Sequence, residues 1–346
     1  MFLAIKEMKH EKLRYGLIVA LILLVSYLLI ILTGLSTGLA NLNKAAINEW
    51  GAKTIILDKD SQGRLAQSYL SAQTLQTTKG SKISQYNSLV TSTGDLKENA
   101  QIIALSKQSF IYRNLKATTG KKFTSKNTAL VADKFKKDGF KIGSKIKIAN
   151  SNVELRIVGF TPRATLSVAP VIYTSFETIK PLNNGVVNAV VTSEKHQFQD
   201  APSNGLVLSI NQFINKLPGY SAQKLTFNFM IGFLYIIIFI VISIFLYILT
   251  TQKLPNFGVL KAQGVPTTYL VMNTLAQSFI MSVIGVFLAI VFGLLTSWFL
   301  PSEVPIVIST MNIVLTSVGI IIMSLLGSLI PIRQIAQVDP YKIIGG

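Results

Sequence analysis

The chain has 346 residues, of which 50% are hydrophobic and only 14% are charged, and its 33 lysines and arginines outnumber its 15 acidic residues. Four long windows contain no charged residue: 15–43, 225–252, 262–302 and 304–332. Roughly 20 apolar residues cross a bilayer as a helix, so each window is long enough to span it. This excludes an ordinary soluble protein and a fibrous or largely disordered one. The absence of cysteine excludes disulfides, thiolate metal sites and cysteine nucleophiles.

The N-terminal part predicts a membrane helix preceded by a basic segment. Residues 1–14 form an amphipathic N-terminal segment, and residues 15–40 form the first transmembrane helix. A cleaved signal peptide is the alternative, because the start is basic. The apolar stretch 16–35 is longer than the 7 to 15 residues typical of a signal peptide, and no clear small-residue cleavage site follows it closely, so we expect a retained helix.

Residues 41–225 predict an α+β domain inserted between the first and second transmembrane helices. Two period-2 runs on either side of the turn 150–152 predict a β-hairpin. Further apolar runs predict strands at 54–57, 101–105, 128–132, 168–173 and 186–191, and helical patterns lie at 175–179 and 210–217. We expect the stretch 61–94, rich in Ser, Thr and Gln, to be the least regular part.

This domain carries 25 lysines and arginines against 11 acidic residues. Its basic surface is suited to anionic lipid headgroups nearby, or to an anionic substrate. Membrane lipid is therefore an expected partner. Nucleic acid is not, because no interleaving of aromatic and basic residues typical of RNA binding is present.

The remaining windows predict three more transmembrane helices, at 226–252, 268–300 and 304–332. Positive charges lie in 1–14, in the connecting segment 253–267 and in the tail 333–346, whereas 301–305 has none. By the positive-inside rule we expect a cell-membrane protein with both termini and the segment 253–267 in the cytoplasm, and with the inserted domain outside the cell.

The segment 253–267 is half polar and predicts a short helix that ends at Gly264. Its run Gly-Val-Leu-Lys-Ala-Gln-Gly-Val at 258–265, with the closing run Pro331, Ala336, Asp339 and Pro340, resembles the FtsX-like permeases of ABC transporters with the macrolide-exporter topology. The resemblance covers the layout of the whole chain. The acidic and basic residues that usually precede Leu-Lys-Ala in this family are replaced here by proline and asparagine.

This resemblance implies a non-catalytic permease that works with a separate dimeric ABC ATPase, which binds the ATP. No phosphate-binding Gly-x4-Gly-Lys-[Ser/Thr] motif is present in the chain. It also implies a second copy of the permease, for which the small residues Gly34 and Gly38 are a candidate contact. The expected ATPase-coupling residues are Phe257, Val259, Leu260, Lys261 and Gly264.

The runs 4–15 and 34–40 are similar to the haem-exporting permeases of Gram-positive bacteria, so haem is the expected transported ligand. No permanently bound cofactor and no metal held by the protein alone are expected. Because the chain has only two histidines, axial ligands would come from tyrosine, methionine or a carboxylate. The candidate substrate-binding residues are Tyr235, Met230, Tyr27, Glu49, Asn228 and Tyr173.

Each candidate has a structural alternative. Tyr235 and Tyr27 lie deep in their predicted spans, where a hydroxyl commonly bonds to a neighbouring helix. Glu49 could be solvated or paired with Lys44, and Tyr173 could be a core or surface residue.

Other functions are open at this point. The chain could belong to a mechanotransmitting complex that controls an extracellular hydrolase, to an exporter of antimicrobial peptides or drugs, or to a membrane-anchored receptor without an ATPase.

Overall fold

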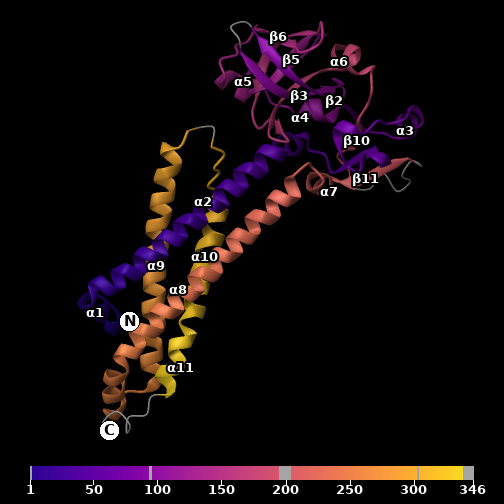
Figure 1. Ribbon diagram of the computed structural model, residues 1–346. Helices are drawn as coiled ribbons and strands as arrows, with labels where there is room; N and C mark the ends of the chain where they lie inside the picture. Colours follow the sequence, from indigo (N-terminus) through magenta and orange to yellow (C-terminus); the bar gives the residue numbers. More distant parts are fainter. Residues whose placement is uncertain (1, 93–95, 195–203, 302–303, 338–346) are drawn as a thin grey trace. The chain divides into compact units, whose positions relative to one another are not determined.

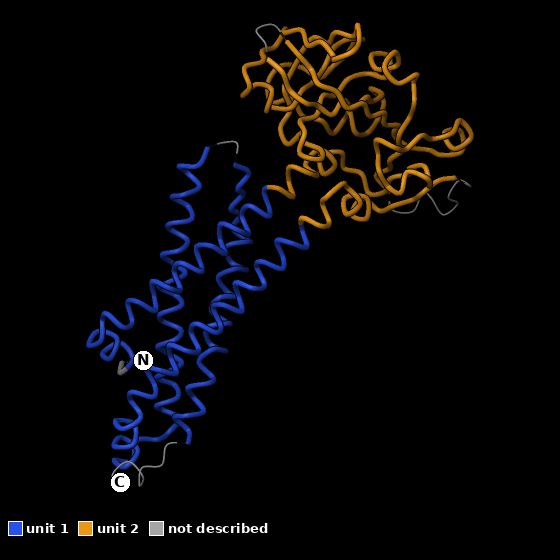
Figure 2. The backbone as a smooth tube through the Cα atoms, viewed as in Figure 1, with its two compact units in different colours: residues 1–38, 224–346 blue, residues 39–223 orange. Residues whose placement is uncertain are grey.

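The computed structural model describes residues 2–92, 96–194, 204–301 and 304–337. The chain forms two compact units (Figure 2). One consists of residues 1–38 and 224–346, and the other of residues 39–223. The closing residues Asp339 and Pro340, on which part of the family resemblance depends, lie outside the described ranges.

Within the described residues, the regular structure of the first unit is helical (Figure 1). Its helices are α1 (Phe2–His10), α2 (Lys12–Trp50), α8 (Tyr220–Ala262), α9 (Thr267–Phe299), α10 (Thr310–Gly327) and α11 (Leu329–Gln337), of which α2 and α8 continue into the second unit. Four stretches in the described chain are long and apolar enough to cross a membrane: Lys12–Trp50, Tyr220–Ala262, Thr267–Phe299 and Thr310–Gln337. Fully buried aliphatic side chains from α2, α8, α9 and α10 pack together in this unit, among them Ile22, Leu29, Ile242, Met281 and Ile320.

The fourth stretch differs from the single helix predicted over 304–332. Residues 305–309 are not helical, and α10 begins only at Thr310, where the Ser309 hydroxyl accepts a hydrogen bond from the Asn312 N–H. The helix is interrupted at Ser328 before α11. Pro331 explains this interruption, because it has no N–H to bond with the carbonyl of Gly327 one turn earlier.

The Gly34 and Gly38 face of α2 is covered by the chain itself. The Val307 N–H donates to the Gly34 carbonyl over 3.0 Å. A Cβ atom added at Gly38 would lie 1.6 Å from the Pro305 carbonyl oxygen. These glycines are therefore used for close packing within the chain, which corrects the prediction that they form the contact with a second copy.

The second unit is an α+β domain, as predicted. In its described part, eleven strands form the sheet, in the order β11-β1-β10-β2-β3-β9-β5-β7-β4 with β6 and β8 off this path. The strands are β1 (Thr54–Asp58), β2 (Ser81–Ser92), β3 (Lys97–Leu105), β4 (Thr119–Gly120), β5 (Thr128–Ala132), β6 (Lys145–Ile148), β7 (Glu154–Thr161), β8 (Thr165–Leu166), β9 (Ala169–Ser175), β10 (Ala189–Thr192) and β11 (Gly205–Ser209). The short helices are α3 (Ala72–Thr77), α4 (Phe110–Asn114), α5 (Asp133–Lys137), α6 (Phe176–Asn183) and α7 (Ile210–Asn215), with 3-10 turns at Lys59–Ser61 and Leu65–Gln67.

The predicted hairpin is confirmed, since β6 and β7 pair antiparallel with Ile146 opposite Leu155. The expectation for 61–94 is wrong. This stretch contains β2, a strand of 12 residues. β2 pairs with β10 and β6 as well as with β3, so ladder hydrogen bonds fix a strand whose Ser, Thr and Asn residues give little apolar alternation.

Candidate functional site

The two predicted tyrosines of the helical unit contact different helices. The Tyr27 hydroxyl on α2 lies 3.0 Å from the Thr296 hydroxyl on α9. Tyr235 on α8 forms a hydrogen bond with Thr316 on α10. Its ring and hydroxyl are close to Gly319, where an added Cβ would lie 2.8 Å from the hydroxyl oxygen. Both tyrosines therefore bond to a neighbouring helix, and they do not share one site.

Asn228 and Met230 lie near the start of α8, and both are exposed. They flank Phe229, whose ring centroid is 4.8 Å from that of Phe233 on the next turn. Phe229 and Phe233 are 66% and 51% exposed, so this part of α8 presents an aromatic face to its surroundings. The predicted pair Asn228 and Met230 is thus near a surface that could contact a flat apolar ligand.

Glu49 and Tyr173 are near one another in the inserted domain. Tyr173 is 1% exposed, and its hydroxyl accepts a hydrogen bond of 3.2 Å from Trp50 Nε1. Burial raises the pKa of the Tyr173 phenol. Glu49 pairs with Arg163 at 3.3 Å, so the expected pairing with Lys44 is wrong. The Lys44 ammonium group instead lies 5.9 Å from the centroid of the Tyr220 ring.

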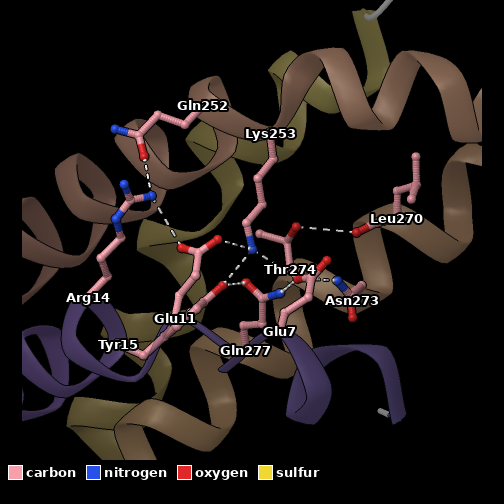
Figure 3. A network of polar contacts seen from close by, with 10 residues as sticks. All are labelled: Glu7, Glu11, Arg14, Tyr15, Gln252, Lys253, Leu270, Asn273, Thr274 and Gln277. Atoms are coloured by element: carbon pink, nitrogen blue, oxygen red, sulfur yellow. Dashed lines mark hydrogen bonds and ion pairs between the residues drawn. The ribbon is translucent and has the colours of Figure 1, made fainter. Parts of the chain in front are cut away.

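A polar network that the sequence analysis missed lies inside the helical unit (Figure 3). Its centre is Lys253 of α8, whose side chain is only 12% exposed. Figure 3 shows Lys253 directed toward two carboxylates from the N-terminal part of the chain. Its ammonium group lies 3.1 Å from Glu7 Oε2 and 3.9 Å from Glu11 Oε1. A buried lysine requires such counter-charges, because an uncompensated charge in an apolar bundle is costly.

Four of these side chains close a ring of hydrogen bonds, and we call Glu7, Tyr15, Lys253 and Gln277 the polar ring. Lys253 donates to the Tyr15 hydroxyl over 3.0 Å, and that hydroxyl donates to Gln277 Oε1 over 3.1 Å. The Gln277 amide donates to Glu7 Oε2, which also accepts from Lys253. The ring thus takes one residue each from α1, α2, α8 and α9.

Two further residues, Asn273 and Arg14, extend the polar network around the ring. Asn273, one turn before Gln277 on α9, donates to Glu7 Oε2 over 3.3 Å. Arg14 donates to Gln252 Oε1 over 2.8 Å and to Glu11 Oε2 over 3.3 Å. Glu7 therefore accepts from three donors, which offsets much of the cost of burying its charge.

The spacing of polar residues at intervals of four is the signal in the sequence that indicates this network. Asn273 and Gln277 are four residues apart, so they share a face of the third apolar window. Glu7, Glu11 and Tyr15 also follow one another at intervals of four. Counting only lysines and arginines for topology gave the two glutamates no role, and no local pattern pairs residues that are 238 to 270 positions apart.

Comparison with known proteins shows what the chain is similar to. The family described as FtsX-like permease C-terminal matches residues 228–340, which include Lys253, Asn273 and Gln277. A protein of Staphylococcus haemolyticus, provisionally named hemin transport system permease protein HrtB, is 28% identical over 100% of this chain and 99% of its own length. A Staphylococcus epidermidis protein of the same name is 27% identical, with the same coverage. Residues 228–340 therefore match the FtsX-like permeases of ABC transporters, and the whole chain is similar to permeases of this type.

The inserted domain has a weaker likeness. The crystal structure of the periplasmic region of MacB from Actinobacillus actinomycetemcomitans matches 48% of this permease and 92% of its own chain, with 13% identity and a TM-score of 0.35. A score this low does not establish a shared fold.

FtsX-like permeases are non-catalytic membrane subunits of ABC transporters, and the similarity of this permease to them implies a separate ATPase partner. Within the described residues, no group of three or more His, Asp or Glu side chains could hold a metal ion.

The predicted coupling residues lie at the end of α8 in the permease, and they face in different directions. α8 continues without a break through Pro255 to Ala262, and Gly264 follows with a φ of +88°, a conformation that favours glycine. Phe257 is buried against Leu270 of α9 and Ile335 of α11, and Leu260 packs against the same cluster.

The other predicted coupling residues differ in exposure. Lys261 donates to the Ile335 carbonyl near the end of α11 over 2.8 Å. Val259 and Gly264 are exposed. Among the predicted residues, these two are thus the ones best placed to meet a partner, whereas Phe257, Leu260 and Lys261 hold the turn between α8 and α9 against α11.

Proposed function

We propose that this permease exports haem, or a similar hydrophobic anion, from the membrane, driven by a separate dimeric ABC ATPase. The observation that carries the proposal is the end-to-end match to relatives provisionally named hemin transport permeases, which covers 100% of this chain and includes the inserted domain. In this proposal the permease works as two copies in the cell membrane. Both termini are cytoplasmic, and the inserted domain is extracellular.

The exposed start of α8 supports a site for such a substrate. Haem offers a flat apolar macrocycle, two carboxylates and an iron that takes axial ligands. Phe229 and Phe233 provide an aromatic face for the macrocycle, and Met230 lies beside them with a thioether. The inserted domain, with 25 basic and 11 acidic residues, would attract the carboxylates.

In this proposal, tyrosine ligation requires a change of partner. The Tyr235 hydroxyl would leave Thr316, or the Tyr27 hydroxyl would leave Thr296, before either could reach the iron. Glu49 would first separate from Arg163, and Tyr173 would need its domain to open. Tyr235 is the strongest of these candidates, because it lies on the same helix as the aromatic face.

The test is purification of the permease together with its ATPase in lipid vesicles. We expect added haemin to stimulate ATP hydrolysis, to give an absorption band distinct from free haemin, and to leave the vesicle membrane in an ATP-dependent manner. A complex that hydrolyses ATP without any response to haemin would contradict the proposed substrate. Cell-separation defects without haem sensitivity in a deletion strain would favour force transmission to an extracellular hydrolase instead.

A further inference from the structure

The polar ring joins the turn between α8 and α9 to the two N-terminal helices of the permease. Lys253 lies nine residues before the end of α8 at Ala262, and Gln277 lies ten residues after the start of α9 at Thr267. Their ring partners Glu7 and Tyr15 belong to α1 and α2. Any movement of the ends of α8 and α9 must therefore either carry α1 and α2 along or break the ring.

The polar ring connects its four helices through hydrogen bonds and a shielded ion pair. The Lys253–Glu7 pair is shielded, since the two side chains are 12% and 21% exposed. Exposed ion pairs contribute little, but removing one member of a buried pair leaves the other charge uncompensated. Because Tyr15 and Gln277 complete the ring, each member has a partner on another helix.

Apolar side chains connect the α8–α9 turn to α11. Phe257, Leu270 and Ile335 form an apolar cluster that joins α8, α9 and α11. Asn273, which bonds to Glu7, lies one turn from Leu270 on α9. The turn is thus fixed to α11 by apolar contacts and to α1 and α2 by the polar ring. The second connection leads to α2, which, like α8, continues into the inserted domain.

We propose that Lys253 and Glu7 are positioning residues that pass movement of the α8–α9 turn to α2 through the polar ring. The inference rests on the proposed function, in which the ATPase binds this turn. Without the ring the turn still engages the ATPase, so hydrolysis continues. The movement then reaches α2 only through the apolar contacts of the bundle, and export falls.

The experiment uses the complete permease with its ATPase in vesicles. Lys253→Met removes the charge and keeps a chain of similar length, and Glu7→Gln removes the opposite charge. Lys253→Arg keeps the charge. Lys12→Met is the matched control, because Lys12 is exposed on α2 and outside the ring. We expect Lys253→Met and Glu7→Gln to retain ATP hydrolysis within about twofold and to lose haemin efflux by at least tenfold, with Lys253→Arg and Lys12→Met near wild type.

A second readout needs no haemin. The chain has no cysteine, so Met8→Cys gives a single thiol on α1, at a side chain that packs partly against the apolar core of the bundle. We expect maleimide to label the Met8→Cys reporter slowly in wild type and at least tenfold faster when combined with Lys253→Met or Glu7→Gln. The exposed Lys9→Cys position should label quickly in every variant.

The outcomes separate the two proposals. Wild-type labelling and efflux in both Lys253→Met and Glu7→Gln would overturn the role of the ring. A parallel fall of hydrolysis and efflux, with poor assembly, would show that the ring only stabilises the fold. If wild type itself does not move haemin, the proposed substrate fails, and the labelling rates together with hydrolysis still decide whether the ring ties α1 to the turn.

Discussion

Tyr235 can be tested as a ligand with a pair of substitutions that the structure supplies. Tyr235→Phe removes the hydroxyl, whereas Thr316→Val removes only its hydrogen-bond partner. If the hydroxyl binds haemin iron, Tyr235→Phe should weaken haemin binding by at least tenfold, and Thr316→Val should leave it unchanged or stronger. An average intramembrane hydrogen bond contributes about 0.6 kcal/mol, so both variants should remain folded. Haemin affinity is measured by titration with absorption spectroscopy. Equal haemin affinity of the two variants would contradict a ligand role for Tyr235.

Tyr173 should make the inserted domain sensitive to alkaline pH. Burial raises its pKa above the ordinary value of about 10, so above this pH the unfolded chain releases a proton that the folded domain keeps bound. The free energy of unfolding must therefore fall as the pH rises beyond about 10. Tyr173→Phe should reduce this fall, whereas Tyr69→Phe, at a tyrosine that is 62% exposed, should not. The free energy of unfolding is measured by urea titration at several pH values. Trp50 fluorescence reports the unfolding, and the Trp298→Phe substitution removes the other tryptophan signal.

At the scale of an element, the α8–α9 turn offers a distinction between partner binding and internal packing. Val259 is 45% exposed, whereas Leu260 contributes to the cluster around Phe257. We expect Val259→Asp to lower permease-stimulated ATP hydrolysis at least fivefold while the permease remains stable. Leu260→Asp should lower thermal stability as well, because it places a charge in an apolar cluster. His10→Asp, at an exposed position outside the turn, is the charge control. Full activity of Val259→Asp in an intact complex would show that this face does not bind the ATPase.

The sequence predicts elements well where the pattern is local. Charge-free windows indicated the long helices, and alternation around residues 150–152 indicated the β6–β7 hairpin. β2 was missed because its pairing, not its own apolar pattern, defines it. The break at Ser328 was missed as well, although Pro331 was visible in the sequence.

The candidate site was harder to predict than the fold. Composition identified deep tyrosines, but it could not show that Tyr27 and Tyr235 contact different helices. It also could not reveal that Arg163 pairs with Glu49, or that Glu7 meets Lys253 across 246 positions. These partners are set by packing of distant segments, about which a single sequence says little.

At the scale of the whole molecule, the absence of cysteine makes the proposed orientation simple to test. Ser151→Cys lies in the turn between β6 and β7, and Gln263→Cys lies in the turn between α8 and α9. We expect a membrane-impermeant maleimide to label Ser151→Cys in intact cells, and to label Gln263→Cys only after the membrane is opened. The reverse pattern would contradict the proposed topology.

The length of α2 determines how far its end moves when the helix tilts. With 39 residues it is about 58 Å long, nearly twice the roughly 30 Å of hydrocarbon in a bilayer. Trp50 at its last position is fully buried in the core of the inserted domain, so the last turn of the helix is part of that core. Treated as a stiff rod pivoting at one end, such a helix would carry its other end about 5 Å when tilted by only about 5°.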